Sequence, residues 1–357
     1  MPIDFGSTRL LNPLSPPRFA PWPSAVSLEL TTRCQLRCRH CYNESGPEQS
    51  GELPLALIER MLGEMHSWGV RQVRLSGGEP TLHSQLEEIL DACKRREIAV
   101  SLNTHGVLAD SILATLLRSS IDRFLVSLDG LESGHEAIRG KGTFRRSVST
   151  CRSLRTAGRS VTIACHVGRH NLHDIAGLAA LASDLGADLK LSPLRPVGRA
   201  LAETQNLMPQ PQDYFDVVSE VSALRRAYRN IRILTDFDII DARQEPFAVT
   251  DAGAACGAGR VMVSIAASGD VYPCAFFVTP DQRFSAGNLH RDSLEAIWHS
   301  SPVFEPFRVH SKAPECQSCG HYRRHCAGGC PAIGHFRCGA IDALDPTCFA
   351  RLMEGDS

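Results

Sequence analysis

The sequence has no excess of charge of either sign and no long apolar run. It contains 38 Lys and Arg against 39 Asp and Glu, a formal net charge of −1 at pH 7, and no block of like charge that would attract a nucleic acid or an anionic membrane surface. No apolar segment approaches the roughly 20 residues that span a bilayer. Residues 1–23 lack the basic and apolar regions of a secretory signal peptide. We therefore expect a cytoplasmic protein that binds neither nucleic acid nor membrane.

Cysteine, by contrast, is abundant, with 14 residues in a chain of 357. Because the cytosol keeps thiols reduced, these cysteines are better interpreted as metal ligands or buried core thiols than as disulfides. The length exceeds one average domain and favours a large domain with a smaller one appended. Composition predicts four parts, namely a proline-rich extended arm (1–23), a main domain (24–200), a connector (201–251) and a cysteine-rich domain (252–357).

Strand and helix patterns alternate along the main domain. The predicted strands are Ser24–Leu30, Val70–Leu75, Ala99–Leu102, Arg123–Ser127, Ser160–Cys165 and Asp188–Leu191. The predicted helices are Leu55–Trp68, Gln85–Arg95, Ser111–Leu117, Thr143–Ala157 and Leu172–Leu185. This alternation specifies an α/β fold with a parallel sheet and right-handed crossovers. It stops near residue 200, too early for a complete eight-unit barrel.

The remainder of the chain has less regular structure. One helix, Gln212–Tyr228, is predicted in the connector, and the C-terminal domain combines strands Val261–Ile265 and Val271–Cys274 with a helix near Ser293–His299. So little regular structure is stable only with cross-links, which metal clusters would supply.

Three cysteines follow the first predicted strand at C-x3-C-x2-C spacing, namely Cys34, Cys38 and Cys41. A 4Fe-4S cluster usually takes four cysteine ligands, so a loop with three leaves one iron open to bind and activate a substrate. The alternative is a zinc loop, with His40 as an imperfect candidate for the fourth ligand.

The loop resembles the cluster loop of radical S-adenosylmethionine (SAM) enzymes. This resemblance implies a partial (β/α)6 TIM-like barrel, in which the open iron chelates SAM and one electron cleaves it to a 5'-deoxyadenosyl radical. It places the catalytic cluster on Cys34, Cys38 and Cys41 and His40 against adenine. In the same way it implies SAM contacts by residues that follow the next strands, namely Ser76, Gly77, Gly78, Glu79, Asn103, Ser127, Asp129 and Arg139. For Asn103 and Asp129 turn chemistry is the alternative.

The C-terminal cysteines resemble a SPASM domain, which holds two auxiliary clusters. By position, one cluster would take Cys256, Cys274 and Cys330, and the second would take Cys316, Cys319, Cys326 and Cys348. The first set lacks a fourth ligand, for which Cys338, His325 and Asp251 are candidates. The spacer between Cys319 and Cys326 is one residue longer than the usual pattern. The alternative is two zinc sites.

Three further cysteines, Cys93, Cys151 and Cys165, fall in predicted helices or strands and are most simply buried side chains. Cys165 ends a predicted strand, so it is also a candidate hydrogen-atom donor at the barrel mouth.

The segments Leu194–Arg199, Cys256–Arg260 and Ala327–Cys330 resemble the mycofactocin and pyrroloquinoline-quinone peptide maturases. The resemblance implies SAM, three 4Fe-4S clusters, an electron donor such as flavodoxin or ferredoxin, and hydrogen abstraction from a ribosomally made peptide. A 23-residue arm is too short for a leader-peptide-recognition domain, so a separate recognition protein is expected. The alternatives are a radical SAM enzyme acting on a small-molecule metabolite and a zinc-stabilised binding protein.

Overall fold

A curved ten-stranded sheet organises the protein, in the order β10-β9-β8-β1-β2-β3-β4-β5-β6-β7. The computed structural model describes residues 19–235, 256–279, 282–309, 313–320, 322, 328–346 and 348. The strands are β1 (Ala25–Glu29), β2 (Gln72–Ser76), β3 (Ala99–Thr104), β4 (Arg123–Ser127), β5 (Val161–Val167), β6 (Asp188–Pro193), β7 (Ile233–Thr235), β8 (Met262–Ile265), β9 (Asp270–Tyr272) and β10 (Gly287–Asn288). Strands β1 to β7 pair in parallel, whereas β8, β9 and β10 pair with one another antiparallel.

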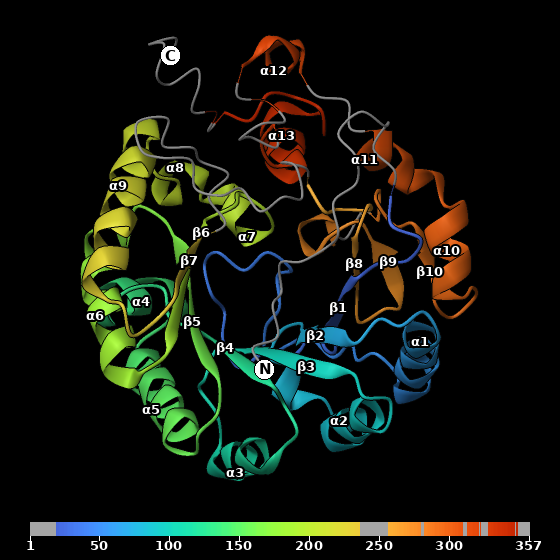
Figure 1. Ribbon diagram of the computed structural model, residues 1–357, viewed down its shortest axis with the longest axis horizontal. Helices are drawn as coiled ribbons and strands as arrows, with labels where there is room; N and C mark the ends of the chain where they lie inside the picture. The colour runs from blue at the N-terminus through green and yellow to red at the C-terminus, as the bar shows by residue number, and fades with distance from the viewer. Residues whose placement is uncertain are drawn as a thin grey trace.

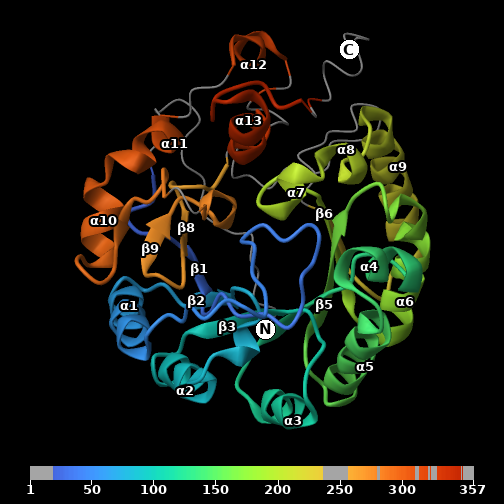
Figure 2. The same cartoon turned by 180° about the vertical axis from the view of Figure 1, so that it is seen from behind.

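Helices cover the outer side of this sheet, as Figure 1 shows and Figure 2 repeats from behind. The longer ones are α1 (Leu55–Ser67), α2 (Leu86–Arg95), α3 (Asp110–Arg118), α4 (Glu132–Arg139), α5 (Thr143–Thr156), α6 (Ile175–Leu185) and α9 (Pro211–Ala227). Shorter ones are α7 (Arg199–Ala202), α8 (Thr204–Leu207), α10 (Leu294–Ser300), α11 (Glu305–Val309), α12 (Pro314–Ser318) and α13 (Pro331–Cys338). None of the described helices is long and apolar enough to cross a membrane.

Alternation along the strands separates a dry outer face from a polar interior. One row across β1 to β4 is fully buried in the core beneath the helices, and it consists of Leu28, Leu75, Leu102 and Phe124. The adjacent row points to the opposite face because strand side chains alternate, and it consists of Ser27, Arg74, Ser101 and Arg123. The barrel interior is therefore lined by polar and charged residues.

The predicted fold class, a partial (β/α)6 TIM-like barrel followed by a small cysteine-rich α+β domain, is confirmed. The parallel alternation nevertheless runs one strand further than predicted, since β7 pairs with β6 after α9. Helix α4 was not predicted either. A three-residue strand has no measurable periodicity, and α4 contains a glycine, Gly134, which weakens the helical pattern.

The C-terminal region extends the barrel sheet. Strand β8 pairs in parallel with β1, with Val263 opposite Val26, and so covers an edge that would otherwise expose unpaired backbone groups. Arg308 lies over the Trp298 ring, 4.5 Å from its centroid, and the Trp298 indole donates to the carbonyl of Ala20 at 3.0 Å. Residues 1–18 of the predicted arm and 236–255 around the predicted connector boundary lie outside the described residues, and the four-part division stays a prediction.

Candidate functional site

The cysteine loop lies between β1 and α1, at the carboxyl end of the barrel strands. Cys34 and Cys38 are buried and Cys41 is half-buried. Burial is the largest cause that raises the pKa of the Cys34 thiol to about 12, and the nearby Glu79, Cys38 and Cys41 raise it further. A positively charged metal centre would favour the thiolate form of this buried thiol. Three cysteines at this spacing can supply the ligands of such a centre, and an iron–sulfur cluster is held by cysteine thiolates.

The spacing of the ligand atoms argues against a single zinc ion in this loop. Thiolates on tetrahedral zinc, with Zn–S bonds near 2.3 Å, lie about 3.8 Å apart. Among the described residues, the one set of three ligand atoms that all lie within 4.8 Å of one another belongs to His40, Asp129 and His166. That set contains no thiol, and His40 is directed at Asp129, with 3.0 Å between its Nε2 and Oδ2.

A distant turn holds the cysteine loop in place. Arg199 donates from Nε to the carbonyl of Cys38 at 2.9 Å and from its backbone N to the carbonyl of Cys41 at 3.0 Å. Gly198 has φ 57°, and a Cβ there would lie 2.2 Å from the carbonyl oxygen of Tyr42. Only glycine permits this contact. The segment that resembled the peptide maturases thus packs directly on the cysteine loop.

The glycine pair after β2 also packs on the start of the loop. Gly78 donates from its backbone N to the carbonyl of Thr31 at 2.7 Å. A Cβ on Gly77 would lie 2.5 Å from that same oxygen, and one on Gly78 would lie 2.2 Å from the carbonyl oxygen of Arg33. The two glycines are therefore required for close backbone packing, and their predicted contact with SAM stays a prediction.

Glu79 is fully buried, and its carboxylate accepts hydrogen bonds from three residues of the protein. Thr81 donates from Oγ1 at 2.8 Å, Thr104 from Oγ1 at 2.9 Å, and His105 from its backbone N at 3.0 Å. These contacts join the turn after β2 to the end of β3. Glu79 thus orients the two neighbouring strand ends at the site.

Asp129 is the centre of a second buried network. It accepts from Arg139 Nε at 2.6 Å, from His40 Nε2 at 3.0 Å and from the backbone N of His166 at 2.7 Å. Burial alone would raise the pKa of Asp129, but the charge of Arg139 and the bonds to the histidines hold it well below its ordinary value. Burial lowers the pKa of His40 to about 4, so this imidazole is neutral.

Three predicted SAM contacts lie on the interior face of the barrel sheet. Ser76, Asn103 and Ser127 occupy interior-facing positions at or near the ends of β2, β3 and β4. Within the described part of the chain, Asn103 Oδ1 and His40 Nδ1 are buried without a hydrogen-bond partner. Buried polar atoms are ordinarily paired, so these two acceptors suit the amino or hydroxyl groups of a bound ligand such as SAM.

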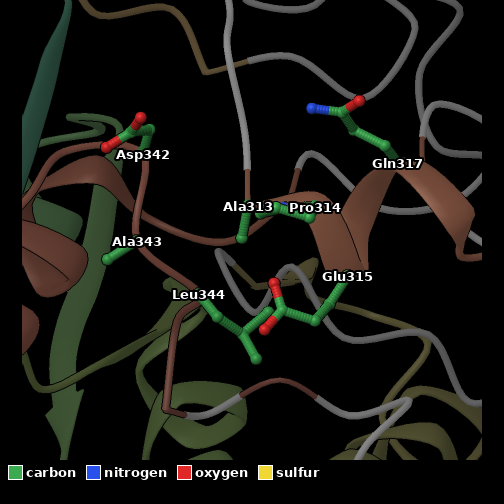
Figure 3. Close-up of a pocket in the computed structure, with 7 residues that line it drawn as sticks. All are labelled: Ala313, Pro314, Glu315, Gln317, Asp342, Ala343 and Leu344. Atoms are coloured by element: carbon green, nitrogen blue, oxygen red, sulfur yellow. The ribbon is translucent and has the colours of Figure 1, made fainter.

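Three auxiliary cysteines from separate segments approach one another. Burial raises the pKa of the Cys274 thiol, and the nearby Cys256 and Cys330 raise it further. This is the same pattern as in the first loop. Cys316 and Cys319 lie in and directly after α12, beside a cavity of about 450 Å³ into which Glu315 and Leu344 extend (Figure 3).

The turn that carries Cys348 is tied to Cys330. Asp345 accepts from the backbone N of Cys330 through Oδ2 at 2.9 Å and from the backbone N of Cys348 through its carbonyl at 2.9 Å. Cys338 is exposed. Cys326, Asp251 and His325 lie outside the described residues, and the division of ligands between two auxiliary clusters stays a prediction.

Sequence reasoning missed the contact between the two cysteine regions. Tyr42 donates to Glu29 Oε1 at 2.9 Å and packs edge-on against Phe276, with 5.9 Å between ring centroids. The Arg195 guanidinium lies 4.8 Å from the Phe276 centroid. Burial raises the pKa of Glu29 to about 7. The positions of Tyr42 beside Cys41 and of Phe276 beside Cys274 were the available signals.

Cys165 is buried, as predicted, and it does not face the barrel mouth, where a hydrogen-atom donor would lie. Cys165 is packed in the hydrophobic core with Ile163 and Val167. Its neighbours Ala164 and His166 occupy the interior-facing positions of β5, because side chains alternate along a strand.

Comparisons with known proteins agree with this geometry. The family model of the radical SAM superfamily matches residues 28–182, and that of the SPASM iron–sulfur cluster-binding domain matches residues 256–320. The chain is 33% identical to a mycofactocin maturase of Mycobacterium ulcerans, over 91% of this chain and 88% of that one. It is 32% identical to a PqqA peptide cyclase of Gluconobacter oxydans, over 91% and 90% of the two chains. The structure of Streptococcus suis SuiB bound to its precursor peptide SuiA is similar with a TM-score of 0.77 and 20% identity, over 92% of this chain and 76% of that one.

Proposed function

The chain belongs to the radical SAM superfamily and carries a SPASM iron–sulfur cluster-binding domain, and on this basis we propose that it modifies a ribosomally made peptide. The observation that carries the proposal is similarity along 91% of the chain to a mycofactocin maturase and to a PqqA peptide cyclase. The name of the second relative denotes work on a peptide. The likeness to SuiB adds only the fold.

We assign the SAM-binding cluster to Cys34, Cys38 and Cys41, and two auxiliary clusters to the C-terminal cysteines. When bound, cluster and SAM together supply a 5'-deoxyadenosyl radical that removes a hydrogen atom from the substrate. Arg199 and Gly198 hold the cysteine loop in the conformation that receives the cluster.

The residues around Asp129 would orient SAM. Asp129 holds Arg139 and His40 at fixed positions, while His40 Nδ1 and Asn103 Oδ1 offer acceptors to donor groups of the ligand. Ser127 would contact the ribose or the carboxylate of SAM. Arg139 Nε is bonded to Asp129, while its Nη1 lies 3.8 Å from Cys38 Sγ and its Nη2 lies 3.5 Å from His40 Nε2. The guanidinium thus lies beside the cysteine loop, where it would meet the SAM carboxylate.

The reaction requires partners beyond the substrate. We propose a small electron donor, flavodoxin or ferredoxin, a separate protein that binds the leader segment of the peptide, and a cytoplasmic location. We further propose that residues 24–200 form the SAM-binding domain and 252–357 the auxiliary domain, joined by residues 201–251, with residues 1–23 as an extended arm.

The test is anaerobic reconstitution followed by incubation with SAM, a reductant and a candidate substrate peptide, for which a short peptide encoded near the gene would be the first choice. We expect absorbance near 400 nm, 5'-deoxyadenosine, and a mass change in the peptide. Replacing Cys34, Cys38 and Cys41 together with alanine should remove about four iron atoms and abolish 5'-deoxyadenosine. SAM cleavage that survives in this variant contradicts the cluster assignment, whereas SAM cleavage without a mass change contradicts the peptide substrate.

A further inference from the structure

We propose that the end of the barrel opposite the cysteine loop binds a small oxyanion ligand, one carrying a carboxylate or phosphate group, between Arg74, Arg123 and Arg232. This site is distinct from the SAM site and its argument does not depend on the proposed reaction. A cavity of about 510 Å³ lies at the amino ends of β1 to β4. Its volume suits a small-molecule ligand.

The sheet register brings the three arginines to this cavity. Arg74 on β2 and Arg123 on β4 belong to one interior-facing row across the sheet. Arg232 directly precedes β7, and curvature of the sheet returns it to the same cavity. Most of the other residues that line the cavity have small, hydroxyl-bearing or apolar side chains. They include Ser27, Ser101, Ser160, Ala25, Ala99 and Met262. Such a lining offers an anion hydroxyl donors, and the exposed Arg74 and Arg232 leave the cavity accessible from solvent.

Two carboxylates, those of Asp188 and Asp122, lie near the arginines among the described residues. Arg232 Nε donates to Asp188 Oδ2 at 3.0 Å, and Asp122, which also lines the cavity, accepts from the backbone N of Val100 at 2.7 Å. Arg74 makes no side-chain hydrogen bond or ion pair with any residue that the structure describes. Arg232 is thus paired with Asp188 through both Nε and Nη2, whereas Arg74 keeps its guanidinium donors available within the described part of the chain.

Mutual repulsion within this cluster supports the same conclusion. Burial lowers the pKa of Arg123, the charges of Arg232 and Arg74 lower it further, and the charge of Asp188 offsets part of this effect. A ligand that brings negative charge would relieve this repulsion. Guanidinium groups bind planar carboxylates and phosphate oxygens through paired hydrogen bonds, which defines the ligand class.

The test measures binding of inorganic pyrophosphate and of glutarate to the reconstituted full chain by calorimetry, at constant ionic strength and with SAM present to fill its own site. We expect at least one probe to bind, and the affinity to fall about tenfold or more in Arg74→Gln and Arg123→Gln. Arg145→Gln is the matched control, because Arg145 is exposed and pairs with Glu132 on the surface. The probe that binds more tightly identifies a phosphate or a carboxylate ligand.

Melting temperatures give an independent readout. Without a probe, Arg74→Gln should melt at the wild-type temperature or above it, since the substitution removes repulsion. A bound probe should raise the melting temperature of the wild type but not that of Arg74→Gln. If neither probe binds the wild type, or if Arg74→Gln and Arg145→Gln bind equally well, the proposal is overturned.

Discussion

The buried pair of Arg139 and Asp129 should contribute far more to stability than a surface pair of similar geometry. The Nε to Oδ2 distance is 2.6 Å, and the side chains are 8% and 0% exposed. The Nε of Arg145 lies 3.0 Å from Oε1 of Glu132, with exposed fractions of 81% and 50%. The two pairs share the same donor atom type and differ mainly in burial.

We expect Arg139→Gln to lower the free energy of unfolding by about 3 to 5 kcal/mol, because it leaves the Asp129 carboxylate buried without its cation. Arg145→Gln should cost between 0 and about 1 kcal/mol. Asp129→Asn should cost a similar amount to Arg139→Gln, and the double variant should cost less than the sum of the single ones. The measurement is urea unfolding of the four variants and the wild type under identical anaerobic conditions.

The double-mutant cycle decides whether the pair is coupled. A loss in Arg139→Gln no larger than in Arg145→Gln would refute the assignment of a buried pair. Additive effects of Arg139→Gln and Asp129→Asn would show that the two residues act separately. Affinity for SAM, measured on the same variants, should fall at least about tenfold in Arg139→Gln, and an unchanged affinity would place Arg139 outside the SAM site.

Three further outcomes follow from the geometry. Gly198→Ala should lower the iron content of the reconstituted protein by about one cluster, because its Cβ would lie 2.2 Å from the Tyr42 carbonyl oxygen. The control Gly158→Ala, at a residue with φ 74° and open space around it, should keep its iron. Equal iron content in both variants would contradict the packing argument. Burial raises the pKa of Glu29 from 4.5 to about 7, so the wild type loses, between pH 4.5 and pH 7, the stability that protonated Glu29 gives it at lower pH. Glu29→Gln should therefore gain about 3 kcal/mol in free energy of unfolding relative to the wild type as the pH rises from 4.5 to 8. Urea unfolding at both pH values checks this, and a difference between the two proteins that does not change with pH would exclude it. Cys348→Ala should lower iron content and melting temperature together while slow SAM cleavage persists, and full iron with normal product would make Cys348 a bystander.

Much of the site could be predicted from local sequence. The spacing of Cys34, Cys38 and Cys41 depends only on a short loop, so it is readable without the fold. The alternation of strands and helices is likewise local, because side-chain periodicity within one element reports its buried face. The positions after β2, β3 and β4 could be placed at one end of the barrel because parallel strands end on the same side.

Only the tertiary structure decided which distant residues meet. Arg199 donates to the carbonyl of Cys38, which lies 161 positions away in the sequence. Strand β8 pairs with the edge of β1, and the local sequence of β8 does not predict that pairing. Arg74 and Arg123, at the end of the barrel opposite the cysteine loop, share a face because of the sheet register. A register shift by one residue would turn their side chains to the outer face. Local sequence determined the cysteine loop and the helices and strands of the barrel. Long-range packing determined which side chains surround each site, because contacts between distant segments depend on closing long loops and not on neighbours along the chain.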